Sequence, residues 1–504
     1  MTIKKQRYHT ALRTGILTAL IFLFFAGTSA DTFAQAWFNN SWSYRKSHVV
    51  NLAAGAGTNY QVQVTVNFGS GTDAGGVVFC NSLCKTDFTD IRFTAADGTT
   101  LLSHWIQSFT ASNNAVFWVK IPGDLSASNQ TIYMYYGNAA VATISSGTNT
   151  FIYYDDGSAT TGWATSGTVG SSNVQGNPVN SLRANGAVGS YLNRNIGIGP
   201  NTFTFFNVRT DAANLGNFFF QCNSAGLGQM YRLDSRGTPN FTGFATTTSW
   251  TVWNAAGTTQ TSSANTWYQF GIAINATGTS STLYYNTGTG TNPVAGTSLG
   301  TFTTTNSGTF IGLVGDGGGP TLFTYWDNII TRKFVSIEPA NAAWGAQELP
   351  PVTFSPATAC QGAAGIVITG TNLTGATAVN FNGVAAVYII NSATQITATV
   401  PLSATTGTIS VTAPAGNSTS LASFTVNAIP VSSVTNQTNI NCFAANDGTI
   451  TVSANSGTGP YTFSVDNGAN FLAPTGTNLR LFTGLLPNTA YRIKVKDNNG
   501  CISK

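Results

Sequence analysis

The stretch TDIRFTAADGTTLLSHW contains four side chains that could take part in chemistry: Asp90, Arg92, Asp97 and His104. A carboxylate and an imidazole can act as general base and acid when they lie within hydrogen-bond reach. Asp90 and Arg92 are two residues apart, so a strand would place both on one face. His104 stands beside Trp105 in a segment with strand character. We therefore interpret the stretch as a surface pair, turn support and strand residues, not as an active site.

The other acids and bases of the chain are few. Hydrolysis of a glycosidic bond uses two carboxyl groups, and the sequence contains only two glutamates, Glu338 and Glu348. A nucleophilic Ser or Cys needs a neighbouring base, and the only histidines beyond residue 36 are His48 and His104. We expect no glycosidase, esterase or protease activity, although a dyad of aspartates stays open.

The cysteines favour disulfides over metal binding. Cys80 and Cys84 could close a short loop as a disulfide. A metal site is the alternative, but no second cysteine pair lies nearby in the sequence and histidines are scarce. The states of Cys222 and Cys360 stay open.

The N-terminus and the composition indicate an exported protein. Four basic residues precede the apolar run 16–25 and the triplet Ala34-Gln35-Ala36, which predicts a signal peptide over residues 1–36. The whole chain has 21 Lys and Arg against 17 Asp and Glu, and most of this excess lies in the signal. A near-neutral remainder gives no electrostatic footprint for nucleic acid, and we expect no transmembrane segment in the mature chain.

The rest of the chain is typical of an all-β protein built from tandem modules. Its charged residues make up only 8% and its aromatic residues 12%, with abundant Gly, which favours strands and turns. In YQVQVTVNF, Val62, Val64 and Val66 alternate with polar residues and predict a half-buried strand. We expect a small sandwich over 37–146, a larger one over 150–348, and two more over 352–427 and 430–504, with Pro350-Pro351 in a linker.

Family resemblances agree with these boundaries. The segments SWSYRKSHVV, TDIRFTAADGTTLL, AVFWVKIPGDL and QTIYMYYGN resemble a secreted bacterial module of unknown function, family 2341. Residues 150–348 resemble a concanavalin A-like jelly roll, and GIVITGTNLTGATAVNFNG resembles the immunoglobulin-like IPT/TIG family. NCFAANDGTITVSANSGTGPYTFSVDNG, with the closing DNNGC, resembles the SprB-type repeat of Bacteroidota adhesins.

The jelly-roll resemblance implies two candidate sites. Trp250 and Trp253 of SWTVWN are three apart, so one ring points outward and could stack on a sugar or merely cover a loop. Asp155, Asp156 and Asp327 could share a structural calcium ion where the first and last strands meet. The alternative is a turn and a capping residue. No cofactor is required, and the Glu-x-Asp-x-x-Glu strand of glycosidases with this fold is absent.

The SprB resemblance implies that Cys442 and Cys501 pair within the final repeat, although both thiols could instead be buried or pair with neighbouring repeats. It also suggests a longer adhesin of which this chain is a fragment. We expect a secreted or cell-surface adhesin-like protein that binds an extracellular glycan or surface polymer through the jelly roll. A polysaccharide-degrading enzyme or its accessory module, and a purely structural stalk, are the alternatives.

Overall fold

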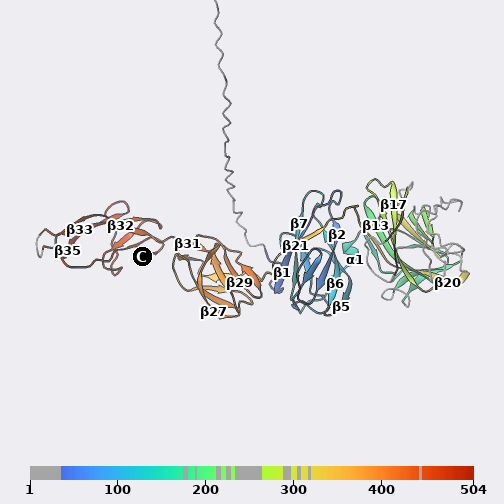
Figure 1. The fold of residues 1–504 in the computed structure, drawn as a ribbon, viewed down its shortest axis with the longest axis horizontal. Coiled ribbons are helices and arrows are strands. Elements are labelled where there is room, and N and C mark those ends of the chain that lie inside the picture. The colour runs from blue at the N-terminus through green and yellow to red at the C-terminus, as the bar shows by residue number, and fades with distance from the viewer. Residues whose placement is uncertain are drawn as a thin grey trace, which may run out of the picture. The chain divides into compact units, whose positions relative to one another are not determined.

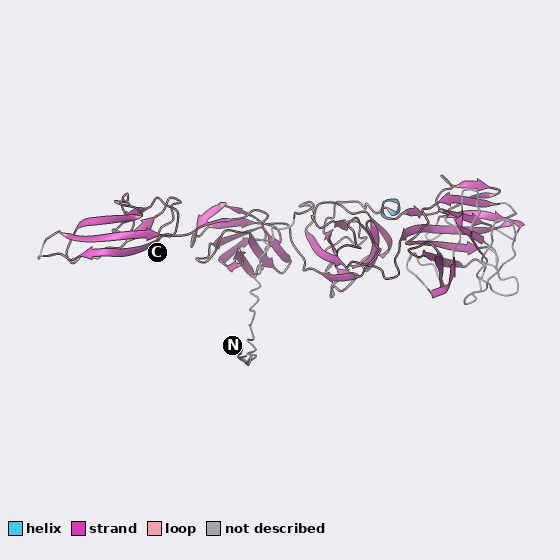
Figure 2. Cartoon of the chain, turned by 90° about the horizontal axis from the view of Figure 1, so that it is seen from above, coloured by secondary structure: helices cyan, strands magenta, loops and turns pink. Residues whose placement is uncertain are grey.

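The computed structural model describes residues 36–173, 180–187, 190–211, 217–222, 229–232, 264–287, 297–303, 308–315, 319–441 and 445–504. In these ranges nearly all regular elements are strands, and the helix α1 (Gly147–Thr150) is a single short turn (Figure 2). The prediction of an all-β fold made of tandem β-sandwiches is confirmed. Residues 1–35, nearly all of the expected signal peptide, lie outside the described residues.

The first module is a sandwich of two four-stranded sheets, with strand orders β21-β1-β7-β4 and β3-β2-β6-β5 (Figure 1). Val62, Val64 and Val66 are buried in its core, as their alternation predicts. Its strands are β1 (Tyr44–Val50), β2 (Tyr60–Asn67), β3 (Val77–Phe79), β4 (Arg92–Thr94), β5 (His104–Thr110), β6 (Asn114–Ile121), β7 (Gln130–Tyr136) and β21 (Asn341–Trp344).

In its described residues, the second module is a larger sandwich of an eight-stranded and a five-stranded sheet around one apolar core. Its first strand, β8, pairs with its last, β20, as expected for the meeting of the chain ends of this module. Its strands are β8 (Tyr153–Asp155), β9 (Ala164–Ser166), β10 (Val169–Ser172), β11 (Ser181–Gly186), β12 (Tyr191–Asn195), β13 (Thr202–Thr210), β14 (Asn217–Cys222), β15 (Gln229–Arg232), β16 (Trp267–Ile274), β17 (Ser280–Thr287), β18 (Thr297–Thr303), β19 (Phe310–Val314) and β20 (Gly319–Lys333).

The boundary expected at residue 348 is wrong, because residues 335–349 belong to the first module. β21 pairs with β1, with His48 opposite Trp344, and Val335 is buried in the core of the first module. The second module is therefore an insertion between β7 and β21. We call residues 335–349 the return segment, since they bring the chain back to the first sandwich.

The third module has two four-stranded sheets, β22-β24-β28-β27 and β26-β25-β29-β30, and a small pair, β23-β31. The fourth has a three-stranded sheet, β32-β33-β35, and the pair β34-β36. The strands of the third are β22 (Thr353–Ser355), β23 (Thr358–Cys360), β24 (Ile366–Thr369), β25 (Ala378–Phe381), β26 (Val384–Ala385), β27 (Val387–Ser392), β28 (Gln395–Thr399), β29 (Ile409–Ala413), β30 (Gly416–Thr419) and β31 (Thr425–Asn427). Those of the fourth are β32 (Val431–Thr438), β33 (Gly448–Asn455), β34 (Thr462–Ser464), β35 (Leu479–Leu485) and β36 (Lys494–Lys496).

Both cysteine pairings expected from the sequence are wrong. Cys501 forms a disulfide with Cys360, across the boundary between the third and fourth modules, and Cys442 lies outside the described residues. Cys80 and Cys84 are free, buried thiols. Burial, and then the hydrogen bond with Cys84, raises the pKa of the Cys80 thiol. The disulfide therefore joins two modules and does not close one repeat.

Loss of the Cys360–Cys501 disulfide in a Cys501→Ser variant should destabilise the last two modules. The link closes a loop with a sequence separation of 141, which the chain-entropy model values at about 5 kcal/mol. Mass spectrometry of a non-reduced digest should show the Cys360–Cys501 peptide. A Cys442→Ser variant is the matched control and should keep that peptide, whereas a Cys442–Cys501 peptide would contradict the assignment.

Candidate functional site

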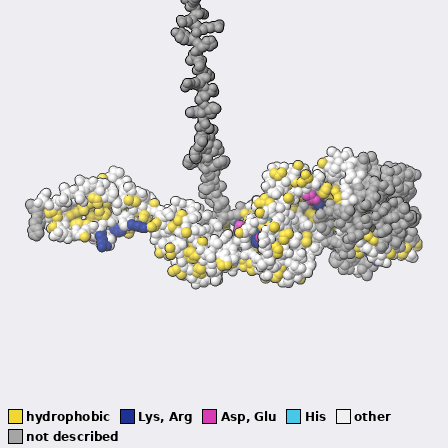
Figure 3. Space-filling view, in the orientation of Figure 1, with side chains coloured by type: hydrophobic (Ala, Val, Ile, Leu, Met, Phe, Trp, Pro, Cys, Tyr) yellow, Lys and Arg dark blue, Asp and Glu magenta, His cyan; other side chains and the backbone are white. Residues whose placement is uncertain are grey.

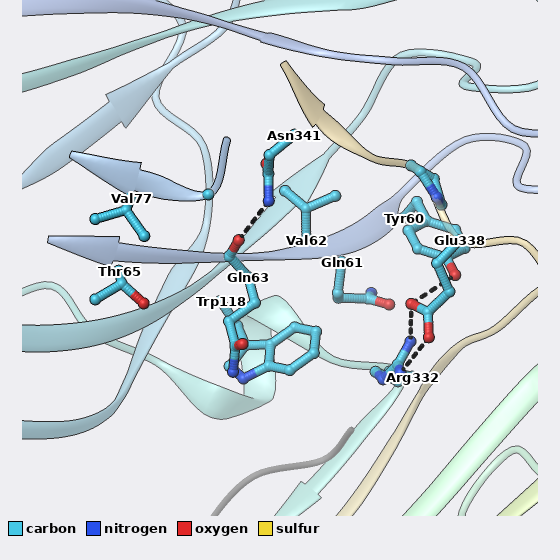
Figure 4. A pocket seen from close by; sticks show the side chains of 12 residues that line it. Tyr60, Gln61, Val62, Gln63, Thr65, Val77, Trp118, Arg332, Glu338 and Asn341 are labelled. Atoms are coloured by element: carbon cyan, nitrogen blue, oxygen red, sulfur yellow. Dashed lines mark hydrogen bonds and ion pairs between the residues drawn. The ribbon is translucent and has the colours of Figure 1, made fainter. Parts of the chain in front are cut away.

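A pocket of about 350 Å³ lies where the return segment meets β2 (Figure 4). We call it the junction pocket. It is lined by Tyr60, Gln61, Val62, Gln63, Thr65, Gly76, Val77, Trp118, Arg332, Glu338, Pro339 and Asn341. The outward side chains of β2 form its floor because the strand alternation directs Val62, Val64 and Val66 into the core.

One end of the pocket is closed by an ion pair. Arg332 of β20 is fully buried and donates two hydrogen bonds to Glu338, both of 2.8 Å. Tyr60 donates a third hydrogen bond to the same carboxylate over 3.1 Å, and burial raises the pKa of Tyr60. The guanidinium carbon lies 5.1 Å from the ring centre of Trp118. This charged group therefore ties the inserted module to the first one.

Asn341 lies beside Gln63, between the ion pair and Thr65 (Figure 4). Its amide nitrogen donates to the backbone oxygen of Gln63 over 2.9 Å, and its amide oxygen lies 2.9 Å from Nε2 of His48. A Cβ atom on Gly76 would come within 2.8 Å of the Asn341 amide. The glycine therefore leaves the space in which this amide bridges the two sheets of the first module.

The end of the pocket away from the ion pair, where Thr65 and Val77 lie, offers groups that can contact a ligand (Figure 4). Thr65 and Gln63 are partly exposed. The Gln63 amide nitrogen donates to Gln107 over 3.0 Å, whereas the Thr65 hydroxyl makes no hydrogen bond with any described residue. Val77 is 37% exposed and supplies an apolar wall. Trp118 is only 2% exposed and donates its indole N–H to Gln107 over 2.7 Å, so its ring is not a free stacking surface.

The acid–base groups that line the pocket are few and are engaged with one another. Glu338 is the one carboxylate among the lining residues, and Arg332 and Tyr60 already occupy it. His48 is buried and stacked on Trp344 with ring centres 4.0 Å apart. Burial lowers the pKa of His48. This arrangement can bind a neutral polar ligand, but it has no pair of carboxylates and no activated nucleophile.

Asp90 and Arg92 are structural, as expected, but they are buried and support loops, so the turn-support interpretation holds and the surface pair does not. The Asp90 carboxylate accepts backbone N–H groups of Lys85, Gly137 and Asn138 at 3.0, 2.8 and 3.2 Å. The Arg92 guanidinium donates to three backbone oxygens, the shortest contact being 2.6 Å to Ala142. The hydrogen bonds of these two charged side chains hold loops against the sheet.

His104 is a strand residue, as predicted, but it lies in the core. It is 1% exposed, and neither ring nitrogen makes a hydrogen bond with a side chain or backbone group of the described residues. It packs against Phe93 and Phe117. Burial, and then the nearby Arg92 charge, lowers the pKa of His104 to about 4. Asp97 accepts backbone N–H groups of Thr99 and Thr100 and stabilises an exposed turn.

The three aspartates proposed as calcium ligands do not form a cluster. Among the described residues, no group of three acidic, His or Cys side chains could hold a metal ion. Asp155 accepts hydrogen bonds from Tyr153 and Trp163, both at 2.9 Å. Asp156 caps Ser158 in an exposed turn, and Asp327 is buried and accepts the Asn328 N–H at 2.6 Å. The contacts of Asp155 and Asp156 fit the turn interpretation, and calcium binding stays a prediction.

Trp250 and Trp253, the predicted ligand-binding residues, lie outside the described residues. Sequence reasoning also missed the residues of the junction pocket. The outward Gln63 and Thr65 were visible as the wet face of a strand. No local pattern, however, indicated that residues 332–341 lie against that face.

Two families match parts of the chain. Residues 87–166 match the family described as a domain of unknown function (DUF2341), and residues 434–470 match the SprB repeat. Together they support a multidomain cell-surface protein of the Bacteroidota type, and the SprB match supports an adhesin-like or binding protein. Among the described residues, no helix is both long and apolar enough to cross a membrane.

The solved structures share little with the whole chain. The tandem CBM22 domains of Paenibacillus barcinonensis Xyn10C are 9% identical, with 59% of this chain and 80% of that chain covered and a TM-score of 0.22. The botulinum neurotoxin type G receptor binding domain is 11% identical, with 63% and 76% covered and a TM-score of 0.19. Titin domains I67–I69 are 14% identical, with 39% and 78% covered and a TM-score of 0.16. A search of curated proteins found no match.

Replacement of Glu338 by Gln should loosen the joint between the first two modules. The change leaves the buried Arg332 without its counter-charge, which should lower the free energy of unfolding by about 2–3 kcal/mol. The loss is not larger because Glu338 is partly exposed and solvent screens part of the interaction. Thermal unfolding and hydrogen exchange of β20 and the return segment would measure the loss. Asp156→Asn, at an exposed carboxylate, is the control and should change neither. Equal behaviour of the two variants would contradict the role of the ion pair.

Because His104 is buried, the free energy of unfolding should fall as the pH is lowered. The folded pKa is about 4 and the unfolded value about 6.5, so protons bind the unfolded state first as the pH drops through this window. The contribution lost between pH 7 and pH 5 is about 2 kcal/mol. His104→Phe, which suits the aromatic surroundings, should reduce this slope in denaturant titrations. An unchanged slope would show that His104 is not the group responsible.

Proposed function

We propose that this chain is a surface adhesin that binds a neutral extracellular glycan in the junction pocket. The observation that carries the proposal is the combination of a preformed cavity of about 350 Å³ with an amide, a hydroxyl and an apolar wall. Ligand sites in proteins commonly occupy 300–1,000 Å³ and use a few polar groups to orient the ligand. The SprB match supports the adhesin-like context.

The chemistry of the lining favours a glycan over a charged ligand. The charges of Arg332 and Glu338 neutralise each other, and amide and hydroxyl groups suit the hydroxyls of a sugar because they can both donate and accept. The indole of Trp118 is covered, so hydrogen bonds and Val77 would carry recognition here. We also propose that binding occurs without turnover, because the single carboxylate is already engaged.

Binding should be tested on the unit formed by residues 34–504 with an array of neutral glycans, followed by calorimetry of the hits. Thr65→Val removes a hydroxyl that has no partner in the described structure and should weaken binding roughly 3–10-fold, the effect of one hydrogen bond. Thr65→Arg should block the pocket and abolish binding.

Thr86→Val is the matched control, since Thr86 is an exposed threonine that does not line the pocket. Hits that survive Thr65→Arg would place binding elsewhere, for example on the jelly roll. The absence of any hit would favour a structural stalk. Release of shortened glycan, detected by mass spectrometry, would contradict binding without turnover and support the enzyme alternative.

A further inference from the structure

The third module carries an exposed apolar strand at the edge of a sheet. β27 is the last strand in the order β22-β24-β28-β27, and in the described part of the chain only β28 pairs with it. Val387 is 79% exposed and Ile389 is 69% exposed. Hydrophobic atoms gather on the part of this module where Figure 1 labels β27 (Figure 3). Single exposed apolar residues are ordinary, but two neighbours on an open edge are not.

The side chains of β27 show that the strand is anchored on one side only. Tyr388 points inward and donates its hydroxyl to the backbone oxygen of Ala376 over 2.8 Å. Val387 and Ile389 are two apart and therefore point outward together. They lie opposite Thr399 and Thr397 of β28, which extend an uncharged face. The free edge thus offers backbone donors and acceptors beside an apolar surface.

The sequence around this edge contains no protecting charge. From Leu349 to Asn446 there is no Asp, Glu, Lys, Arg or His. Edge strands of natural proteins are commonly guarded against pairing by charges, proline or a covering element. In β27, Val-Tyr-Ile-Ile-Asn-Ser has neither charge nor proline. The edge is therefore chemically open to another strand.

We propose that β27 is a self-association site that pairs in antiparallel fashion with β27 of a second copy of this chain. A two-fold axis at Tyr388 places Val387 of each copy opposite Ile389 of the other, so the same apolar patch completes itself. Two copies bring together no charged side chain from this module, so like-charge repulsion does not oppose the contact. A charged partner would gain no ion pair here, which favours a second copy over an acidic or basic partner.

The contact is small, so a single pairing is weak and many copies on one surface strengthen it through avidity. Such homotypic pairing would join protein molecules on the same cell or on neighbouring cells. It is independent of the junction pocket, which lies in other modules, so the failure of either proposal leaves the other intact.

Sedimentation equilibrium of residues 34–504 over roughly 1–200 µM should show concentration-dependent association, which corresponds to a Kd near the micromolar range. Ile389→Lys places two positive charges across the axis and should weaken association at least about ten-fold. Ile389→Thr keeps the strand propensity, loses apolar area and should weaken it less. Leu421→Lys, at a loop residue that is 50% exposed, is the matched control and should associate like the unchanged chain.

Salt gives an independent test. Association through an uncharged edge should hardly change between low and high ionic strength, whereas a contact between charged surfaces weakens with salt. A monomer throughout the concentration range would overturn the proposal. So would association that Ile389→Lys and Leu421→Lys affect equally, or association that salt abolishes. Circular dichroism of each variant shows that a change in association is not a loss of folding.

Discussion

The arrangement of the first two modules depends on the return of the chain to β1 after an insertion of a whole sandwich. β21 supplies the edge of a sheet whose other strands lie far earlier in the sequence, so the first module is complete only when the second has been made. A buried guanidinium must have a partner, because an unpaired charge in the interior is costly. Arg332 at the end of the insertion meets this requirement through Glu338 of the return segment and so fixes where the segment re-enters.

The junction pocket follows from this return. Gln61 lies on the face of β2 that alternation predicts to be wet, yet it is buried because its amide spans the junction. It donates to Thr150 and accepts from the backbone N–H of Lys333, at 3.0 and 2.9 Å. Farther along the same strand, Gln63 and Thr65 are not covered to the same degree. The floor of the pocket is thus the part of a polar strand face that the insertion leaves open.

Sequence reasoning reached the strands and the order of modules, because alternation and turn residues are local signals. It could not reach contacts that close over long separations. Cys501 was expected to pair with Cys442 inside one repeat, but its partner is Cys360 in the preceding module. Likewise, residues 335–348 read as the end of the jelly roll because nothing in their composition marks a change of sheet. Buried polar residues such as Asp90 looked like surface residues, since their backbone partners lie in loops that the sequence does not bring together.

Ion pairs lie where the first two modules meet the return segment, whereas the third module contains no charged residue. Both glutamates lie in the return segment and form ion pairs: Glu338 with Arg332 of the second module, and Glu348 with Arg45 of the first at 2.7 Å. Leu349, which follows Glu348, donates its backbone N–H to Asn417 of the third module over 2.6 Å. These two glutamates therefore help to specify how the modules meet. Beyond this point the third module has no charge, and its stability must come from its apolar core and backbone hydrogen bonds. Such a surface has no charge that would oppose the pairing of another strand with an open edge, and one side of β27 is such an edge in the described chain.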